Sequence, residues 1–118
     1  MSLANKLNLK TGMTVRVINK PVDVNLDDLV ATGSANADGV LVFVKTRRDV
    51  DTKSGPAVEA ARADRLAWIA YPKAGKLGTD LNRDILWKHL SGKGIQGVRQ
   101  IAIDDVWSAM RFRPATSR

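Results

Sequence analysis

The chain has 118 residues, of which 44% are hydrophobic and 26% are charged, and this composition is typical of one globular domain rather than of a disordered segment. It contains no cysteine, which excludes disulfide bonds, thiolate metal sites and cysteine nucleophiles and favours an intracellular setting. The net charge of +7 is concentrated in residues 61–118, which hold 11 basic and 5 acidic side chains, against 8 and 7 in residues 1–60. A basic half attracts phosphate groups, nucleic acid or acidic proteins, or serves solubility alone.

The N-terminal sequence carries no export signal. The segment MSLANKLNLKTG has neither the apolar stretch nor the cleavage site of a signal peptide. The longest apolar runs, GVLVFV and LAWIAYP, are much shorter than the roughly 18 residues that cross a bilayer. We therefore expect a cytoplasmic protein with no membrane partner.

The first part of the chain predicts two strands around a short helical turn. Residues 13–18 alternate between polar and apolar, which is typical of a half-exposed strand, and Arg16 favours a place at the edge of a sheet. Asn25 is placed to cap a helical turn over residues 26–32, whose sequence LDDLVAT puts two aspartates in the first turn. Residues 40–44 form a continuous β-branched and aromatic run, typical of a strand covered on both faces.

Two helices and a second buried strand are predicted next. Pro56 is suited to the first turn of a helix and is followed by AVEAARADR. Residues 66–71 (LAWIAY) indicate another buried strand, which a proline ends. Thr79 or Asp80 then caps a helix over residues 81–90, which ends near two glycines.

The end of the chain predicts an antiparallel pair of strands. Residues 95–103 and 106–113 are spaced for a tight hairpin with its turn at 104–105. The whole order, β-α-β-α-β-α-β-β, indicates a single α/β domain with three parallel strands and a C-terminal antiparallel hairpin. Right-handed crossovers that move in one direction place their helices on one face of the sheet. The other face is then covered either by the N-terminal segment with Leu3 and Leu7 or by a second subunit of a homodimer.

The element order over residues 38–114 resembles the C-terminal half of Rossmann-like S-adenosylmethionine-dependent methyltransferases, which end in two parallel strands, a helix and an antiparallel hairpin. The resemblance implies a reduced, five-stranded sheet in the order 1-2-3-5-4, with residues 13–18 and 95–103 at its edges. Such enzymes have a glycine-rich turn after the first strand and an acid at the end of the next. Here the first strand runs into NKPVDVN, without glycine, and the next ends in Val44 and Lys45. We therefore expect no cofactor.

Four strings resemble a second family, of small uncharacterised bacterial proteins classed as a domain of unknown function. The strings are LKTGMTVRVINKP at 9–21, AWIAYPK at 67–73, TDLNRDILW at 79–87 and IDDVWSAMRFRP at 103–114, and together they span nearly the whole chain. The resemblance implies a bacterial origin and no established activity.

The loop PKAGKLGTD at 72–80 is the strongest candidate for ligand binding. It places two lysines and two glycines before a helix N-terminus, where backbone amides and the helix dipole hold anions. It is not a P-loop, because Leu77 stands where that motif requires Ser or Thr. A solvated turn is the alternative interpretation. The candidate ligand-binding residues are Lys73, Lys76, Thr79, Asp80 and Arg83.

Other charged residues have simpler interpretations. Arg83 opposes the helix dipole in the first helical turn, so we expect it to pair with an acid, such as Asp104 or Asp105, or to bind a ligand's anion. The two aspartates fit a hairpin turn better than a metal or acid–base pair, because adjacent turn residues point apart. His89 is the only histidine and has no partner at ligand spacing, so neither a metal site nor a Ser-His-Asp triad is expected.

The last strand offers a basic surface. Arg111 and Arg113 share a face of that strand with Trp107, and Arg99 lies on the neighbouring strand. Basic and aromatic side chains on a sheet can bind single-stranded nucleic acid. No recognised motif accompanies them, so we do not expect a nucleic-acid partner.

The sequence favours a non-catalytic binding or interaction domain with a basic, anion-binding rim, because the scaffold lacks a cofactor loop and a convincing nucleophile, base or metal set. Two alternatives remain open. One is a small enzyme acting on a phosphate- or carboxylate-bearing substrate, with Asp80 or Asp84 as the acid–base group and Lys73 as an electrostatic stabiliser. The other is a degenerate methyltransferase.

Overall fold

The computed structural model describes residues 3–10, 12–22, 24–26, 29–33, 37–73 and 75–115. Six strands form one sheet: β1 (Val15–Ile18), β2 (Ala31–Thr32), β3 (Gly39–Phe43), β4 (Leu66–Pro72), β5 (Ile95–Ala102) and β6 (Trp107–Pro114). The helices are α1 (Leu3–Lys6), α2 (Arg47–Lys53), α3 (Gly55–Arg62) and α4 (Arg83–Leu90), and the short 3-10 helix η1 (Ser91–Lys93) follows α4. None of the helices in the described ranges has the length and apolar character that crossing a bilayer requires.

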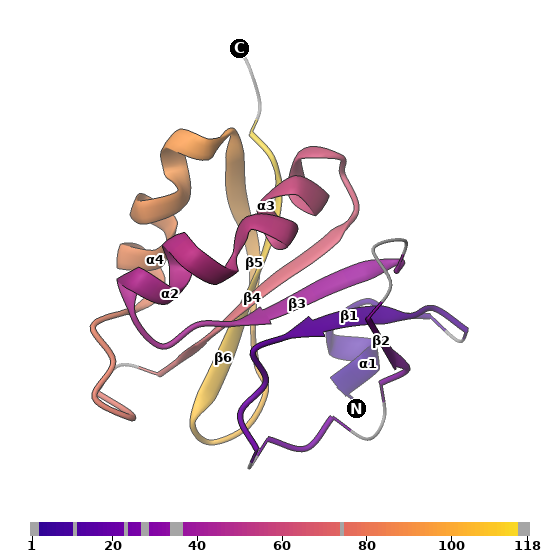
Figure 1. The fold of residues 1–118 in the computed structure, drawn as a ribbon, viewed down its shortest axis with the longest axis horizontal. Helices are drawn as coiled ribbons and strands as arrows, with labels where there is room; N and C mark the ends of the chain where they lie inside the picture. Colours follow the sequence, from indigo (N-terminus) through magenta and orange to yellow (C-terminus); the bar gives the residue numbers. More distant parts are fainter. Residues whose placement is uncertain are drawn as a thin grey trace.

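The sheet has the strand order β2-β1-β3-β4-β6-β5 (Figure 1). β1 pairs in parallel with β2 and β3, and β3 pairs in parallel with β4, whereas β6 is antiparallel to both β4 and β5. The predicted mixed α/β domain is therefore confirmed, with its parallel strands and its C-terminal hairpin. The predicted count of five strands is wrong, because β2 lies outside β1. The five predicted strands keep their expected order among themselves.

The additional strand replaces part of the predicted helical turn at 26–32. Ala31 and Thr32 pair with β1, and the carbonyl of Val30 accepts a 2.9 Å hydrogen bond from the amide of Val15. Without this pairing, the backbone groups on the outer side of β1 would have no hydrogen-bond partners within the sheet. The need to bond these groups outweighs the weak helical preference of residues 26–32. β1 is accordingly not the edge of the sheet. Asp27 and Asp28, placed in the same predicted turn, lie outside the described residues.

One face of the sheet, which we name the helical face, packs against α2, α3 and α4 (Figure 1). Its strand residues include Val40, Val42 and Ile69, which alternate with residues of the opposite face. α3 begins as predicted, with Pro56 in its first turn. The buried residues that the three helices contribute are Val50, Ala57, Val58, Ala60, Ala61, Leu86 and Leu90.

α2 lies between the predicted strand at 40–44 and the helix that Pro56 begins, in a stretch for which the sequence predicts neither a helix nor a strand. The hydroxyl of Thr46 accepts a 3.1 Å hydrogen bond from the amide of Asp49, and a carboxylate oxygen of Asp49 accepts one of 3.0 Å from the amide of Lys45. This reciprocal arrangement closely resembles a capping box, which starts a helix by satisfying its first free amides. The signal was therefore present in the sequence as Thr-Arg-Arg-Asp.

The opposite face, which we name the N-terminal face, carries Leu41, Phe43 and Trp68. Leu7, just after α1, is fully buried against it, and the Leu7 carbonyl accepts a 3.0 Å hydrogen bond from the indole Nε1 of Trp68. The buried Val24, Leu26 and Leu29 belong to the same cluster. The sequence predicted that either the N-terminal segment or a second subunit covers this face. The structure shows the N-terminal segment packed on it.

The hairpin of β5 and β6 turns at Asp104, as predicted. One carboxylate oxygen of Asp104 accepts hydrogen bonds of 2.8 Å from the amides of both Val106 and Trp107, which fixes the turn. The strand register shifts between Gly97 and Arg99, which marks a β-bulge in β5. The hairpin brings side chains of β5 and β6 to the carboxyl end of β4.

Candidate functional site

A pocket of about 440 Å³ lies where β4 ends, against the start of α4 and the hairpin. We name it the β4–α4 pocket. Its volume is within the range of pockets that hold small molecules. The residues that line it are Tyr71, Lys73, Asn82, Arg83, Asp84, Gln100 and Ser108.

The floor of the pocket is made by neutral polar side chains of neighbouring strands. Tyr71 of β4 and Ser108 of β6 are direct cross-strand partners and are 2% and 6% exposed. Gln100 of β5 is exposed and lies two residues from Ala102, the β5 partner of Ser108. The Tyr71 hydroxyl is buried and, among the described residues, has no partner that meets hydrogen-bond geometry. A buried hydroxyl without a partner is uncommon and calls for an explanation.

The environment of Tyr71 keeps its hydroxyl protonated. Burial raises the pKa of Tyr71, because the phenolate loses hydration inside the protein, while the charge of Arg83 and the side chain of Gln100 act in the opposite direction. Burial is the largest of these effects. The hydroxyl therefore carries its proton at neutral pH and can donate it in a hydrogen bond.

The first turn of α4 forms one wall. The side-chain oxygen of Asn82 accepts a 2.8 Å hydrogen bond from the amide of Ile85, so Asn82 caps the helix, and not Thr79 or Asp80 as predicted. The expectation of Asp104 or Asp105 as the partner of Arg83 is also wrong. Arg83 Nε instead lies 3.3 Å from a carboxylate oxygen of the adjacent Asp84.

Lys73 continues from the end of β4. Its backbone amide donates a 2.7 Å hydrogen bond to the carbonyl of Val106, just before β6, and this bond extends the pairing of β4 with β6. The side chain is half-buried and lines the pocket together with Arg83. The structure therefore brings two of the five predicted ligand-binding residues together.

The other three predicted residues lie outside the lining of the pocket. Thr79 donates its hydroxyl hydrogen bond to the carbonyl of Lys45 and accepts one of 3.0 Å from the amide of Leu81. A carboxylate oxygen of Asp80 accepts a 3.0 Å hydrogen bond from the amide of Arg47, at the start of α2. Both residues thus hold the loop against the beginning of α2. Lys76 is exposed within the loop's turns.

Four lining residues were not predicted: Tyr71, Asn82, Gln100 and Ser108. Tyr71 was assigned only to a buried strand, although it is the single polar side chain in LAWIAYP. That polar residue at the end of an apolar run was the one available signal. The contribution of Gln100 and Ser108 depends on the register of the hairpin, which the sequence pattern does not specify.

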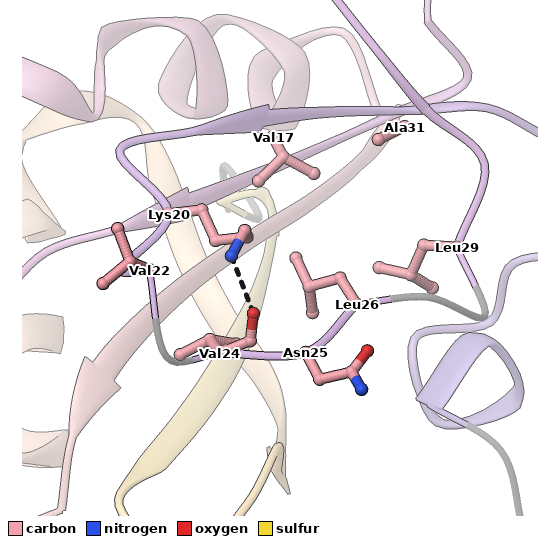
Figure 2. Close-up of a pocket in the computed structure, with 8 residues that line it drawn as sticks. All are labelled: Val17, Lys20, Val22, Val24, Asn25, Leu26, Leu29 and Ala31. Atoms are coloured by element: carbon pink, nitrogen blue, oxygen red, sulfur yellow. Dashed lines mark hydrogen bonds between the residues drawn. The ribbon is translucent and has the colours of Figure 1, made fainter.

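A second, larger pocket lies beside β1, with a volume of about 800 Å³ (Figure 2). Its lining is mostly aliphatic and consists of Val17, Lys20, Val22, Val24, Asn25, Leu26, Leu29 and Ala31. The amine of Lys20 points into this region and donates hydrogen bonds of 2.7 and 2.8 Å to the carbonyls of Val24 and Pro21. Among the described residues that line this pocket, Lys20 is the one cation, and its amine is already bound to backbone oxygens.

The turn that leaves β1 begins with Asn19, which has a φ of 62°. Asparagine tolerates this left-handed conformation better than most residues, so the turn forms without glycine. The side-chain nitrogen Nδ2 of Asn19 donates a 2.9 Å hydrogen bond to the carbonyl of Phe43, at the end of β3. The side chain thus bridges the carboxyl ends of the two strands.

Two of the remaining polar candidates, His89 and Arg113, each pair with an aspartate. His89 Nε2 lies 2.8 Å from a carboxylate oxygen of Asp51. Arg113 donates two hydrogen bonds, of 2.9 and 3.1 Å, to the carboxylate of Asp64. Nε of Arg111 is buried and has no hydrogen-bond partner among the described residues. The described residues contain no cluster of His, Asp or Glu side chains that could hold a metal ion.

Comparison of the sequence with models of known protein families and with curated proteins found no match. The resemblance to the small bacterial family of unknown function therefore stays a prediction. The functional argument rests on the geometry of the β4–α4 pocket.

Proposed function

We propose that this chain is a binding domain for a small ligand that carries a phosphate or carboxylate group, held in the β4–α4 pocket. The observation that carries the proposal is the buried hydroxyl of Tyr71, which makes no hydrogen bond of good geometry among the described residues although Gln100 lies near it, in a pocket that Lys73 and Arg83 also line. A polar group left without a partner inside a protein costs stability, and binding sites are where such groups gain their partner on ligand binding.

The charges around the pocket favour an anion. Lys73 and Arg83 both belong to the basic half of the chain, and the N-terminus of α4 adds its dipole. The ion pair between Arg83 and Asp84 does not prevent this role. Both side chains are exposed, at 59% and 81%, and an exposed pair of this kind contributes about 1 kcal/mol or less. Arg83 can therefore exchange Asp84 for a ligand's oxyanion at little cost.

The binding role is favoured over catalysis by the surroundings of the polar groups. Asp80, one of the two candidate acid–base residues, is bound to the amide of Arg47 and does not line the pocket. Asp84 does line it, and it is the residue on which an enzymatic alternative would depend. Ser108 is buried on the floor, while the only histidine pairs with Asp51. No histidine or cysteine is among the described residues of the lining, so it contains neither a serine–histidine nor a cysteine–histidine pair.

A methyltransferase-like frame with a different ligand site is consistent with this proposal. The fold of that class places its adenosyl cofactor beyond the first strand. In this chain Asn19 bridges the ends of β1 and β3, and Lys20 is bound to backbone carbonyls. These contacts support a domain that keeps the frame of the class without its cofactor site.

The proposal is tested by thermal shift and calorimetry with inorganic phosphate, citrate, nucleotides and S-adenosylmethionine. A ligand at a hundredfold its dissociation constant adds about 2.7 kcal/mol to the free energy of unfolding. We expect stabilisation by anions, loss of it in Lys73→Gln and Arg83→Gln, and no loss in the matched control Arg48→Gln, which removes an exposed arginine of α2. Binding that is equal in all three variants, or that only S-adenosylmethionine produces, contradicts the proposal.

A further inference from the structure

We infer that the ligand of the β4–α4 pocket is a hydroxylated acid, meaning a polyol that carries a phosphate or carboxylate group, rather than a simple anion or a nucleotide. This inference rests on the proposed function and deepens it. It follows from how neutral and charged groups are distributed in the pocket.

The floor of the pocket is suited to hydroxyl groups. Tyr71 and Ser108 face one another across β4 and β6 as direct partners, and both are buried. A hydroxyl both donates and accepts, so a ligand hydroxyl can satisfy either side chain without bringing a charge into a buried position. Burial disfavours charge at this position, which is also why it raises the pKa of Tyr71.

The cations line the same pocket beside this floor, and the charge of Arg83 acts on Tyr71. Lys73 follows β4, and Arg83 extends from the first turn of α4 with 59% of its side chain exposed. A ligand that uses both regions therefore places its acid beside Lys73 and Arg83 and its hydroxyl groups toward Tyr71. Asp84, which lines the same wall, supplies a carboxylate that accepts from a further ligand hydroxyl.

The lining does not favour a nucleobase. Tyr71 is the one aromatic residue among the lining residues, and it is only 2% exposed, so its ring offers no open stacking surface. Recognition of nucleobases generally uses such a surface. Gln100 is exposed and close enough to affect the pKa of Tyr71, so it is the side chain that we expect to move when a ligand reaches the hydroxyl.

The experiment compares probes that differ only in their hydroxyl groups. Calorimetry measures the dissociation constants of glycerol 3-phosphate and propyl phosphate, and of glycerate and propionate as the carboxylate arm, with glycerol alone as the uncharged probe. We expect the hydroxylated acid to bind at least about tenfold more tightly than its deoxy counterpart in one of the two arms. Glycerol alone is expected not to bind measurably.

Two variants assign this preference to the floor. Tyr71→Phe keeps the ring and removes the hydroxyl, and we expect it to reduce the preference for the hydroxylated acid to below about threefold. Thr52→Val is the control, because the hydroxyl of Thr52 donates to the carbonyl of Arg48 on α2. Gln100→Ala, at an exposed position, is a second variant that does not challenge the fold, and we expect it to change the affinity of the hydroxylated acid more than that of its deoxy counterpart.

The outcomes separate the two proposals. Equal binding of hydroxylated and deoxy acids overturns the inference about ligand class and leaves anion binding intact. A preference that survives in Tyr71→Phe also overturns it. Failure of every acid to bind, or binding of glycerol as tight as that of its phosphate, overturns the proposed function itself.

Discussion

Substitution of Leu7 by alanine tests whether the N-terminal segment is an integral part of the core. Leu7 is 0% exposed and packs in the cluster of the N-terminal face, while its carbonyl binds the indole of Trp68. Removing a fully buried leucine side chain in this way costs about 3 kcal/mol, within a general range of about 2–5 kcal/mol. A domain of this size is stable by only about 5–15 kcal/mol, so the loss is easily measured.

The measurement is urea unfolding followed by tryptophan fluorescence. With an m-value of about 1.5 kcal/mol/M, a loss of about 3 kcal/mol lowers the midpoint by about 2 M urea. Leu77→Ala is the matched control, because Leu77 lies in a surface loop and is 48% exposed, and it should change the midpoint very little. If Leu7→Ala and Leu77→Ala have the same small effect, the segment does not cover the sheet in solution and a second subunit becomes the better explanation.

Three further predictions concern stability and titration. The hydrogen bonds from Arg113 lower the pKa of Asp64, so the wild type should have a higher free energy of unfolding than Asp64→Asn at neutral pH. This difference should disappear as the pH falls below about 4, where Asp64 becomes protonated. Urea titrations that give the same difference at low pH as at neutral pH contradict this prediction. Tyr71 is the only tyrosine, and burial raises its pKa, so ultraviolet absorbance should show a single tyrosinate titration with its midpoint above about 10. The wild type should lose stability relative to Tyr71→Phe once the pH exceeds about 10, where the tyrosine of the unfolded chain ionises before that of the folded protein, and a midpoint at or below 10 refutes the burial argument. A β-carbon on Gly97 would lie 2.5 Å from the sulfur of the buried Met110, which then has to shift, so Gly97→Ala should cost about 1–2 kcal/mol in urea unfolding. An unchanged midpoint would show that the Met110 side chain yields without cost.

All five predicted strands are present, and the two central ones, β3 and β4, were the most predictable from local sequence. The runs GVLVF in β3 and LAWIAYP in β4 are buried along their whole length, and their composition alone indicates central strands. β2 could not be predicted, because two residues carry no periodic pattern and the strand exists only through the backbone bonds that β1 requires. α2 was missed for a different reason, since its capping signal at Thr46 and Asp49 was overlooked.

The candidate site was predictable only on its charged side. Lys73 and Arg83 were identified because glycines, lysines and a helix start follow a buried strand, and this pattern needs no knowledge of distant contacts. Thr79 and Asp80 belong to the same pattern, yet their bonds to Lys45 and Arg47 depend on where α2 begins. The neutral floor was not predictable, because it requires the register of β4, β6 and β5.

The two edge strands of the sheet affect whether this domain aggregates at high concentration. Growth of a fibril by addition of strands needs a long, regular row of free amides and carbonyls. At one margin β2 presents only two residues, and at the other the bulge between Gly97 and Arg99 puts the backbone out of step with any straight incoming chain. Copies of this protein that meet at high concentration should therefore associate through side chains on their surfaces and remain able to separate again.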